Sequence, residues 1–164
     1  MKIVKLFFLT LPLFFSSCVS QKFIPKEETR LIPTGSQIIE IKTETEPKEI
    51  YKTVYSLLIE NGFRVDKENA DMLTLSTEGK DLGQSTFGRI YITIKKDNNG
   101  SLLTLRPDWK PGAEAQMMAS AMTNLNVYTE WTPAKWGVSG RPELVFSYFV
   151  SFAKKISNSI AYKQ

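Results

Sequence analysis

The sequence contains no histidine. Histidine is the commonest general base near neutral pH and a frequent metal ligand, so its absence excludes Ser-His triads, Cys-His dyads and most zinc or non-haem iron sites. The chain has a single cysteine, Cys18, so no intrachain disulfide forms. Carboxylates, lysines, tyrosines and serines remain, and none stands in an arrangement diagnostic of a reaction. The sequence therefore predicts a protein without enzymatic activity, metal or cofactor.

A long hydrophobic run is also lacking. The most apolar stretch, Leu6–Phe15, is about ten residues long and is interrupted by Thr10 and Pro12, whereas a membrane-spanning helix needs about twenty. This stretch follows Lys2 and Lys5. A short positive region followed by a short apolar region is typical of a secretory signal peptide.

Two serines and then Cys18 follow the apolar stretch. This pattern resembles the signal of bacterial lipoproteins, in which the cysteine becomes the lipidated first residue of the mature protein. Phe15 stands where the usual motif has leucine, as in the looser motifs of Bacteroidota. The resemblance implies a signal peptide over residues 1–18 and attachment to the cell envelope, at the outer membrane, through a lipid on Cys18. The alternative is an ordinary signal peptide cleaved near Ser20.

The 146 residues after Cys18 carry 19 basic and 17 acidic side chains and a net charge of +2. So small a charge does not indicate nucleic-acid binding, and an envelope location argues against it as well.

Residues 19–35 contain two prolines, clustered charges and no apolar period, which predicts a flexible tether. The remaining residues, 36–164, have the length of one domain.

Alternation of apolar and polar residues predicts strands over 37–44, 63–67, 72–78, 86–96 and 101–107. The Asp97–Gly100 segment between the last two favours a hairpin turn. Helical spacing predicts one helix that begins at Pro47 and ends before Gly62, and another from Pro142 towards Tyr162. The apolar stripe of the second helix comprises Val145, Phe149, Phe152, Ile156 and Ile160.

The predicted order is strand, helix, four strands, helix. The outer sheet face would be polar; it carries Glu40, Arg64, Asp66, Glu78, Arg89 and Arg106. This pattern predicts an α+β two-layer sandwich, a largely antiparallel five-stranded sheet with helices on one face. It resembles TATA-binding-protein-like and helix-grip domains, which small envelope lipoproteins also use. Among these are the lipoprotein C component of the β-barrel assembly machinery and Bacteroidota lipoproteins of unknown function. The resemblance rests on element order and carries no site residues.

Two polar clusters have both a functional and a structural interpretation. The segment Asp66–Asp71 is rich in oxygen ligands, but it lacks the glycine and the final glutamate of a calcium-binding EF-hand loop. We therefore predict a polar turn.

Four acidic residues could supply a carboxylate pair for glycoside hydrolysis, but their positions around a helix start favour a role in complementing the helix dipole. They are Glu40, Glu44, Glu46 and Glu49.

The segment 106–141 joins the last predicted strand to the last helix and contains all three tryptophans and three of the five methionines. Its composition predicts a short helix over 113–125. Such a segment either covers a sheet edge or core end, binds an envelope protein through its thioethers and aromatics, or binds a glycan or small ligand. The candidate binding residues are Trp109, Met117, Met118, Met122, Tyr128, Trp131 and Trp136. The overall prediction is a lipid-anchored, non-catalytic interaction or structural protein, with a glycan- or apolar-ligand-binding module as the alternative.

Overall fold

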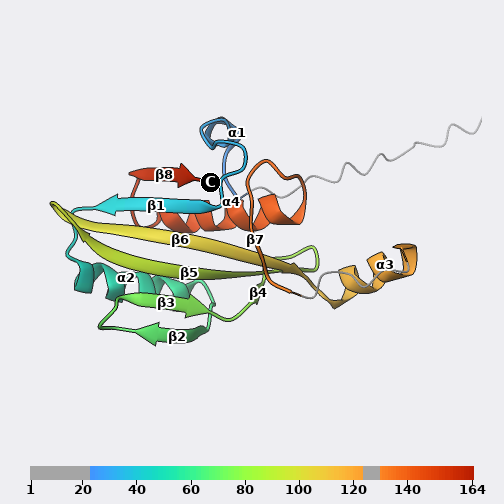
Figure 1. The fold of residues 1–164 in the computed structure, drawn as a ribbon, viewed down its shortest axis with the longest axis horizontal. Coiled ribbons are helices and arrows are strands. Elements are labelled where there is room, and N and C mark those ends of the chain that lie inside the picture. The colour runs from blue at the N-terminus through green and yellow to red at the C-terminus, as the bar shows by residue number, and fades with distance from the viewer. Residues whose placement is uncertain (1–22, 124–129) are drawn as a thin grey trace, which may run out of the picture.

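The computed structural model describes residues 23–123 and 130–164. They form a mixed α+β fold of one antiparallel open sheet and four helices (Figure 1). The helices are α1 (Lys26–Thr29), α2 (Pro47–Glu60), α3 (Ala113–Thr123) and α4 (Arg141–Lys154). The strands are β1 (Ile38–Thr43), β2 (Val65–Asn69), β3 (Thr74–Thr77), β4 (Lys80–Asp81), β5 (Thr86–Asp97), β6 (Gly100–Pro111), β7 (Thr132–Pro133) and β8 (Ile160–Lys163).

The hairpin of β5 and β6 forms the centre of the sheet. Each strand has 12 residues, and the pairing of Asp97 with Gly100 confirms the predicted turn. The strand order is β2-β3-β5-β6-β1-β8, with β4 paired to β5 and β7 paired to β6. Because the two central strands extend beyond their neighbours, α3 continues from the far end of β6 and lies away from the sheet (Figure 1).

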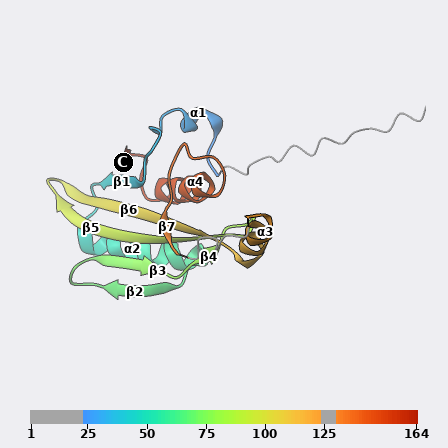
Figure 2. The same cartoon turned by 45° about the vertical axis from the view of Figure 1, so that its right-hand side comes forward.

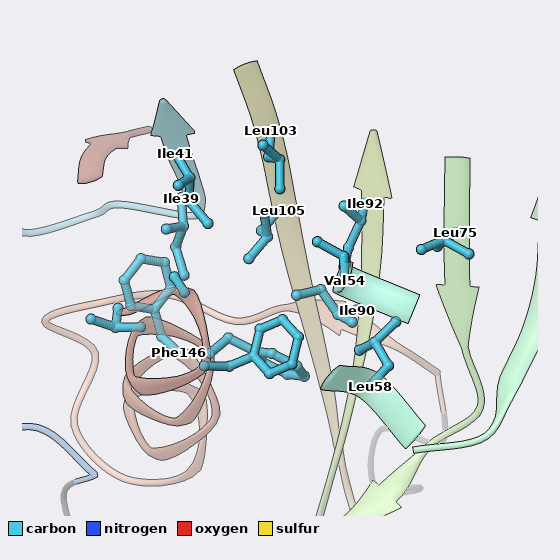
Figure 3. Packing of buried hydrophobic residues seen from close by; sticks show 14 of the residues in the cluster. Ile39, Ile41, Val54, Leu58, Leu75, Ile90, Ile92, Leu103, Leu105 and Phe146 are labelled. Atoms are coloured by element: carbon cyan, nitrogen blue, oxygen red, sulfur yellow. The ribbon is translucent and has the colours of Figure 1, made fainter. Parts of the chain in front are cut away.

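The core lies between the sheet and helices α2 and α4. Inward-facing side chains of β1, β3, β5 and β6 meet those of both helices in one layer (Figure 3). The alternation that predicted the strands is the cause, since successive residues of a strand point to opposite faces. The largest fully buried side chains include Phe146, Phe149, Phe152, Ile39, Ile41, Leu58, Ile92 and Leu105.

Helix α2 has the predicted bounds. Pro47 occupies its first turn, where a missing N–H leaves no hydrogen bond unmade. Val54 and Leu58 are fully buried on the sheet side. Gly62, with φ at +74°, follows the helix end and donates its N–H to the carbonyl of Ile59 (2.8 Å). This left-handed conformation favours glycine, as the sequence pattern indicated.

The prediction of a final helix as far as Tyr162 is wrong. Helix α4 ends at Lys154, and the chain then forms the edge strand β8 against β1. The polar residues between them make the break: the Ser157 hydroxyl donates to the Lys42 carbonyl (2.9 Å), and the Ser159 carbonyl accepts from the Lys42 N–H (3.1 Å). Ile160 and Tyr162 therefore point to the core side of the sheet as strand residues.

The five-stranded sheet is likewise corrected to eight strands. The additional strands are β4, β7 and β8, and two of them have only two residues each. Such short strands carry too few residues for an alternating pattern to be recognised. The predicted strands 63–67 and 72–78 occupy Val65–Asn69 and Thr74–Thr77, with a register shift after Val65.

Residues 23–35 belong to the folded domain, so the boundary predicted at Ser36 is too late. Ile24 and Ile32 are each 5% exposed and join the core cluster. The Phe23 ring packs edge-on against Tyr148 of α4, with centroids 4.9 Å apart, and Glu28 of α1 pairs with Lys154. Figure 2 shows α1 on the same side of the molecule as α4. Apolar side chains in an irregular segment have no period, which is why the sequence pattern did not reveal this contact.

The predicted signal peptide over 1–18, and Cys18 with it, lies outside the described residues. Among residues 23–123 and 130–164, no helix combines the length and apolar character needed to cross a membrane.

Candidate binding surfaces

Two of the three tryptophans in segment 106–141 belong to the core. Trp136 is 5% exposed, its ring lies 6.2 Å from that of Phe146, and its backbone N–H donates to the Ser36 carbonyl (2.9 Å). Trp109 in β6 is half-buried and packs against the core cluster. Ala134, between β7 and Trp136, is fully buried. This part of the segment therefore covers the core, as one of the three interpretations expected.

Helix α3 is the part of the segment that stays exposed. Met117, Met118 and Met122 are 70%, 69% and 87% exposed, while Ala115 is buried. The helix occupies Ala113–Thr123, close to the predicted 113–125. Single exposed apolar side chains are common on protein surfaces, whereas three on one short helix form an exposed apolar patch, which makes α3 a candidate contact surface. Tyr128, also named as a candidate, lies outside the described residues.

The start of α3 is fixed to the sheet. The N–H of Gly112 donates to the Ser85 carbonyl (2.8 Å), and the N–H of Ala115 to the Ser85 hydroxyl (3.3 Å). The Gln116 side-chain amide donates to the Pro111 carbonyl (2.8 Å). These bonds set the direction in which the helix leaves β6, so its methionines are held at a defined end of the molecule (Figure 2).

Trp131 lies on the opposite side of the sheet from the core. The guanidinium carbon of Arg89 is 4.6 Å from its ring centroid, and Lys110 Nζ is 4.7 Å from it. Arg89 is held in turn by Asp108, whose Oδ2 accepts from Nε (3.0 Å) and Nη2 (2.8 Å). A Cβ on Gly79 would lie 2.5 Å from Trp131 Cη2, so glycine is needed for the ring to lie there. The result is an ordered cation–aromatic cluster.

A hollow of about 380 Å³ adjoins this cluster on the same outer face. Its polar lining includes Lys67, Ser76, Arg89, Tyr91, Arg106 and Asp108. Tyr91 is paired across the hairpin with Arg106, and Ser76 with Tyr91, so the three side chains lie in one row across β6, β5 and β3. A second hollow of about 340 Å³ is lined by Trp131 itself, together with Lys110, Phe87 and Glu78.

The alternating pattern predicted Arg89 and Arg106 on the outer face of the sheet but did not indicate that they form a site. The sequence does contain a signal for the site, in the turn of the hairpin. The two-residue turn at Asn98 and Asn99 sets the register of the hairpin, and this register places Arg89 beside Asp108 and Tyr91 beside Arg106.

The structure brings together three of the four acidic residues considered for hydrolysis and places Glu40 apart from them. Glu40 pairs with Lys163 on the outer face (2.7 Å). The other three, Glu44, Glu46 and Glu49, line an open hollow of about 780 Å³ next to the hairpin turn, where Glu46 pairs with Lys96 (3.7 Å). The hydrogen bond from the backbone N–H of Asn98, followed by the contact with Lys42, lowers the pKa of the nearby Asp97. These contacts tie the helix start to the hairpin turn.

The segment Asp66–Asp71, predicted as a polar turn, continues strand β2 as far as Asn69, and only its last two residues form the turn towards β3. The Asn69 Oδ1 accepts from the N–H of Asp71 (3.1 Å) and of Met72 (2.9 Å). Within residues 23–123 and 130–164, no group of three or more acidic or thiol side chains is placed to hold a metal ion. Elsewhere, burial raises the pKa of Tyr148 and of Tyr162, both of which pack against the core.

No protein-family model matches the chain, and a comparison with curated proteins gives no match.

Proposed function

We propose that the protein is a lipid-anchored component of a bacterial cell envelope that binds an envelope partner protein through helix α3, without catalysing a reaction. The observation that carries the proposal is the exposure of 69–87% at Met117, Met118 and Met122. Methionine is flexible and polarisable, so a methionine-bearing helix fits the apolar groove of a partner. The anchored start of α3 keeps this surface in one orientation, which lowers the entropy lost on binding.

The proposed anchor is Cys18 at the outer membrane, on the strength of the signal-like residues before it. Two or more acyl chains on one residue give stable membrane attachment. We also propose that the domain is an extended version of the TATA-binding-protein-like or helix-grip architecture. Supporting this, α2 and α4 both pack on the core face of the sheet, and β1, β2, β3, β5 and β6 follow the predicted chain order around α2.

The test replaces all three α3 methionines with glutamine in the full chain. Because these side chains are exposed, we expect an unchanged melting temperature and loss of the partner that co-purifies with wild type from detergent-solubilised envelopes. Met72→Gln is the matched control, since Met72 is 70% exposed in the turn between β2 and β3, away from α3.

A photo-reactive residue at position 118 should also cross-link to the same partner, and one at position 72 should not. If the triple variant retains its partner, or if position 72 cross-links equally well, α3 is not the binding surface.

A further inference from the structure

The outer face of the sheet presents two cations whose side chains have no partner among the described residues. Within residues 23–123 and 130–164, Arg89 pairs with Asp108, whereas the side chains of Arg106 and Lys67 make neither an ion pair nor a hydrogen bond. The two lie around the same hollow of about 380 Å³. Apart from the Arg89–Asp108 pair, the remaining charge there is Asp66, which offsets only one of them. An open guanidinium beside a hollow is suited to a carboxylate, which it binds through two parallel N–H donors.

The surroundings of Arg106 are already ordered. Tyr91 lies directly across the strand pair and is 45% exposed, and Ser76 continues the row on β3. Arg89 is fixed by two hydrogen bonds to Asp108 and by its position over Trp131. A ligand at Arg106 therefore meets a flat ring, hydroxyl groups and a positive field that need little rearrangement on binding.

We propose that this outer-face site, formed by Arg106, Tyr91, Ser76, Lys67 and Arg89, binds an acidic saccharide, a sugar ring that carries a carboxylate. The carboxylate pairs with Arg106, the ring lies against Tyr91, and sugar hydroxyls reach Ser76 and Lys67. This site is separate from α3 and does not depend on the interface proposed there.

The backbone favours a saccharide over an acidic peptide. An extended peptide usually binds a sheet by adding a strand to a free edge. Here β5 lies between β3 and β6, and β6 lies between β5 and strands β1 and β7. Their backbone groups are thus largely engaged, so a ligand over Arg106 and Tyr91 meets side chains alone, and the free edge of the sheet at β2 lies on the far side of β3.

The experiment is isothermal titration of the full chain in detergent with four probes: trigalacturonate, the uncharged galactotriose, hexaglutamate and inorganic phosphate. We expect trigalacturonate to bind at least tenfold more tightly than each of the others. Arg106→Gln should weaken it at least tenfold, with an unchanged melting temperature because Arg106 is exposed. Lys95→Gln is the matched control, since Lys95 is an exposed cation of β5 on the same face that does not line the hollow.

Three outcomes overturn the proposal. The first is the absence of trigalacturonate binding. The second is equal binding of hexaglutamate or phosphate, which would show attraction by charge alone. The third is an equal effect of Arg106→Gln and Lys95→Gln. Tyr91→Leu should weaken trigalacturonate binding but leave any phosphate binding unchanged, which separates ring contact from charge.

Discussion

Phe149 provides a quantitative test of the core. Its side chain is fully buried, and its ring centroid lies 5.5 Å from that of Phe63, 5.3 Å from Tyr148 and 6.4 Å from Phe152. Replacing a buried phenylalanine with alanine costs about 3–5 kcal/mol, because apolar contacts are lost and a cavity remains. Aromatic pairs add about 0.5–1.5 kcal/mol each beyond the burial of their area. With three ring neighbours, we expect Phe149→Ala to fall in the upper half of the first range.

The assay is urea unfolding of the full chain at several temperatures, with far-ultraviolet circular dichroism as the measured signal. The midpoint should fall while the slope with denaturant stays constant, since the native and unfolded states expose similar areas in both proteins. A loss of about 4 kcal/mol in a domain of this size lowers the melting temperature by roughly 10–15 °C.

Tyr91→Ala serves as the control because Tyr91 is 45% exposed on the outer face, and it should cost far less. A loss below about 1 kcal/mol for Phe149→Ala would refute the packing of α4 on the sheet, since so small a value is typical of surface substitutions.

Three further predictions concern the anchor, the tryptophans and pH. Cys18→Ala should move the protein from the membrane fraction to the soluble fraction, and persistence in the membrane after a high-salt wash would contradict lipid attachment. Trp136→Ala should destabilise by about 3–5 kcal/mol in urea unfolding because Trp136 is 5% exposed, whereas Trp131→Ala should cost much less; similar losses would contradict the different placement of the two rings. Burial raises the pKa of Tyr148 and Tyr162 above the ordinary 10.0, so the folded state binds the phenolic proton more tightly than the unfolded chain does. The stability that depends on these protons is complete below pH 10 and is lost as the pH rises through the folded-state pKa values. Between about pH 8 and pH 11, Tyr148→Phe should therefore lose less stability than wild type.

The elements that the sequence predicted well are those with local signals. The hairpin of β5 and β6 has a long alternating pattern on both sides of a turn rich in asparagine and glycine, and α2 begins at Pro47 and ends before Gly62. Each of these signals lies within the element or next to it. Local backbone preferences and side-chain periods therefore suffice to place them.

The end of the chain was mispredicted because one set of residues fits two periods. Ile156 and Ile160 are four apart, as on a helix face, but Ile160 and Tyr162 are two apart, as on a strand face. The pairing of Ile160 with Ile41, a residue far away in sequence, favours the strand. No local pattern encodes that contact.

Composition alone also does not show which of the three tryptophans lie in the core and which lies on the outer face. Trp136 is drawn into the core beside Phe146 and bonds to the Ser36 backbone, whereas Trp131, only five positions earlier, lies on the outer face beside Arg89. The short strand β7 begins between them, at Thr132, and its pairing with β6 sets where each ring is directed. A two-residue strand carries no signal that a sequence pattern reveals.

The contact between Phe23 and Tyr148 limits how far the domain stands from a membrane. Only five peptide steps separate Cys18 from Phe23, and a fully extended chain spans about 3.6 Å per residue, so the two Cα atoms are at most about 18 Å apart. With a lipid on Cys18, the side of the domain that carries Tyr148 is held against the lipid headgroups. The domain is then confined to a layer next to the bilayer, so a partner of α3 has to come within about one domain length of the membrane.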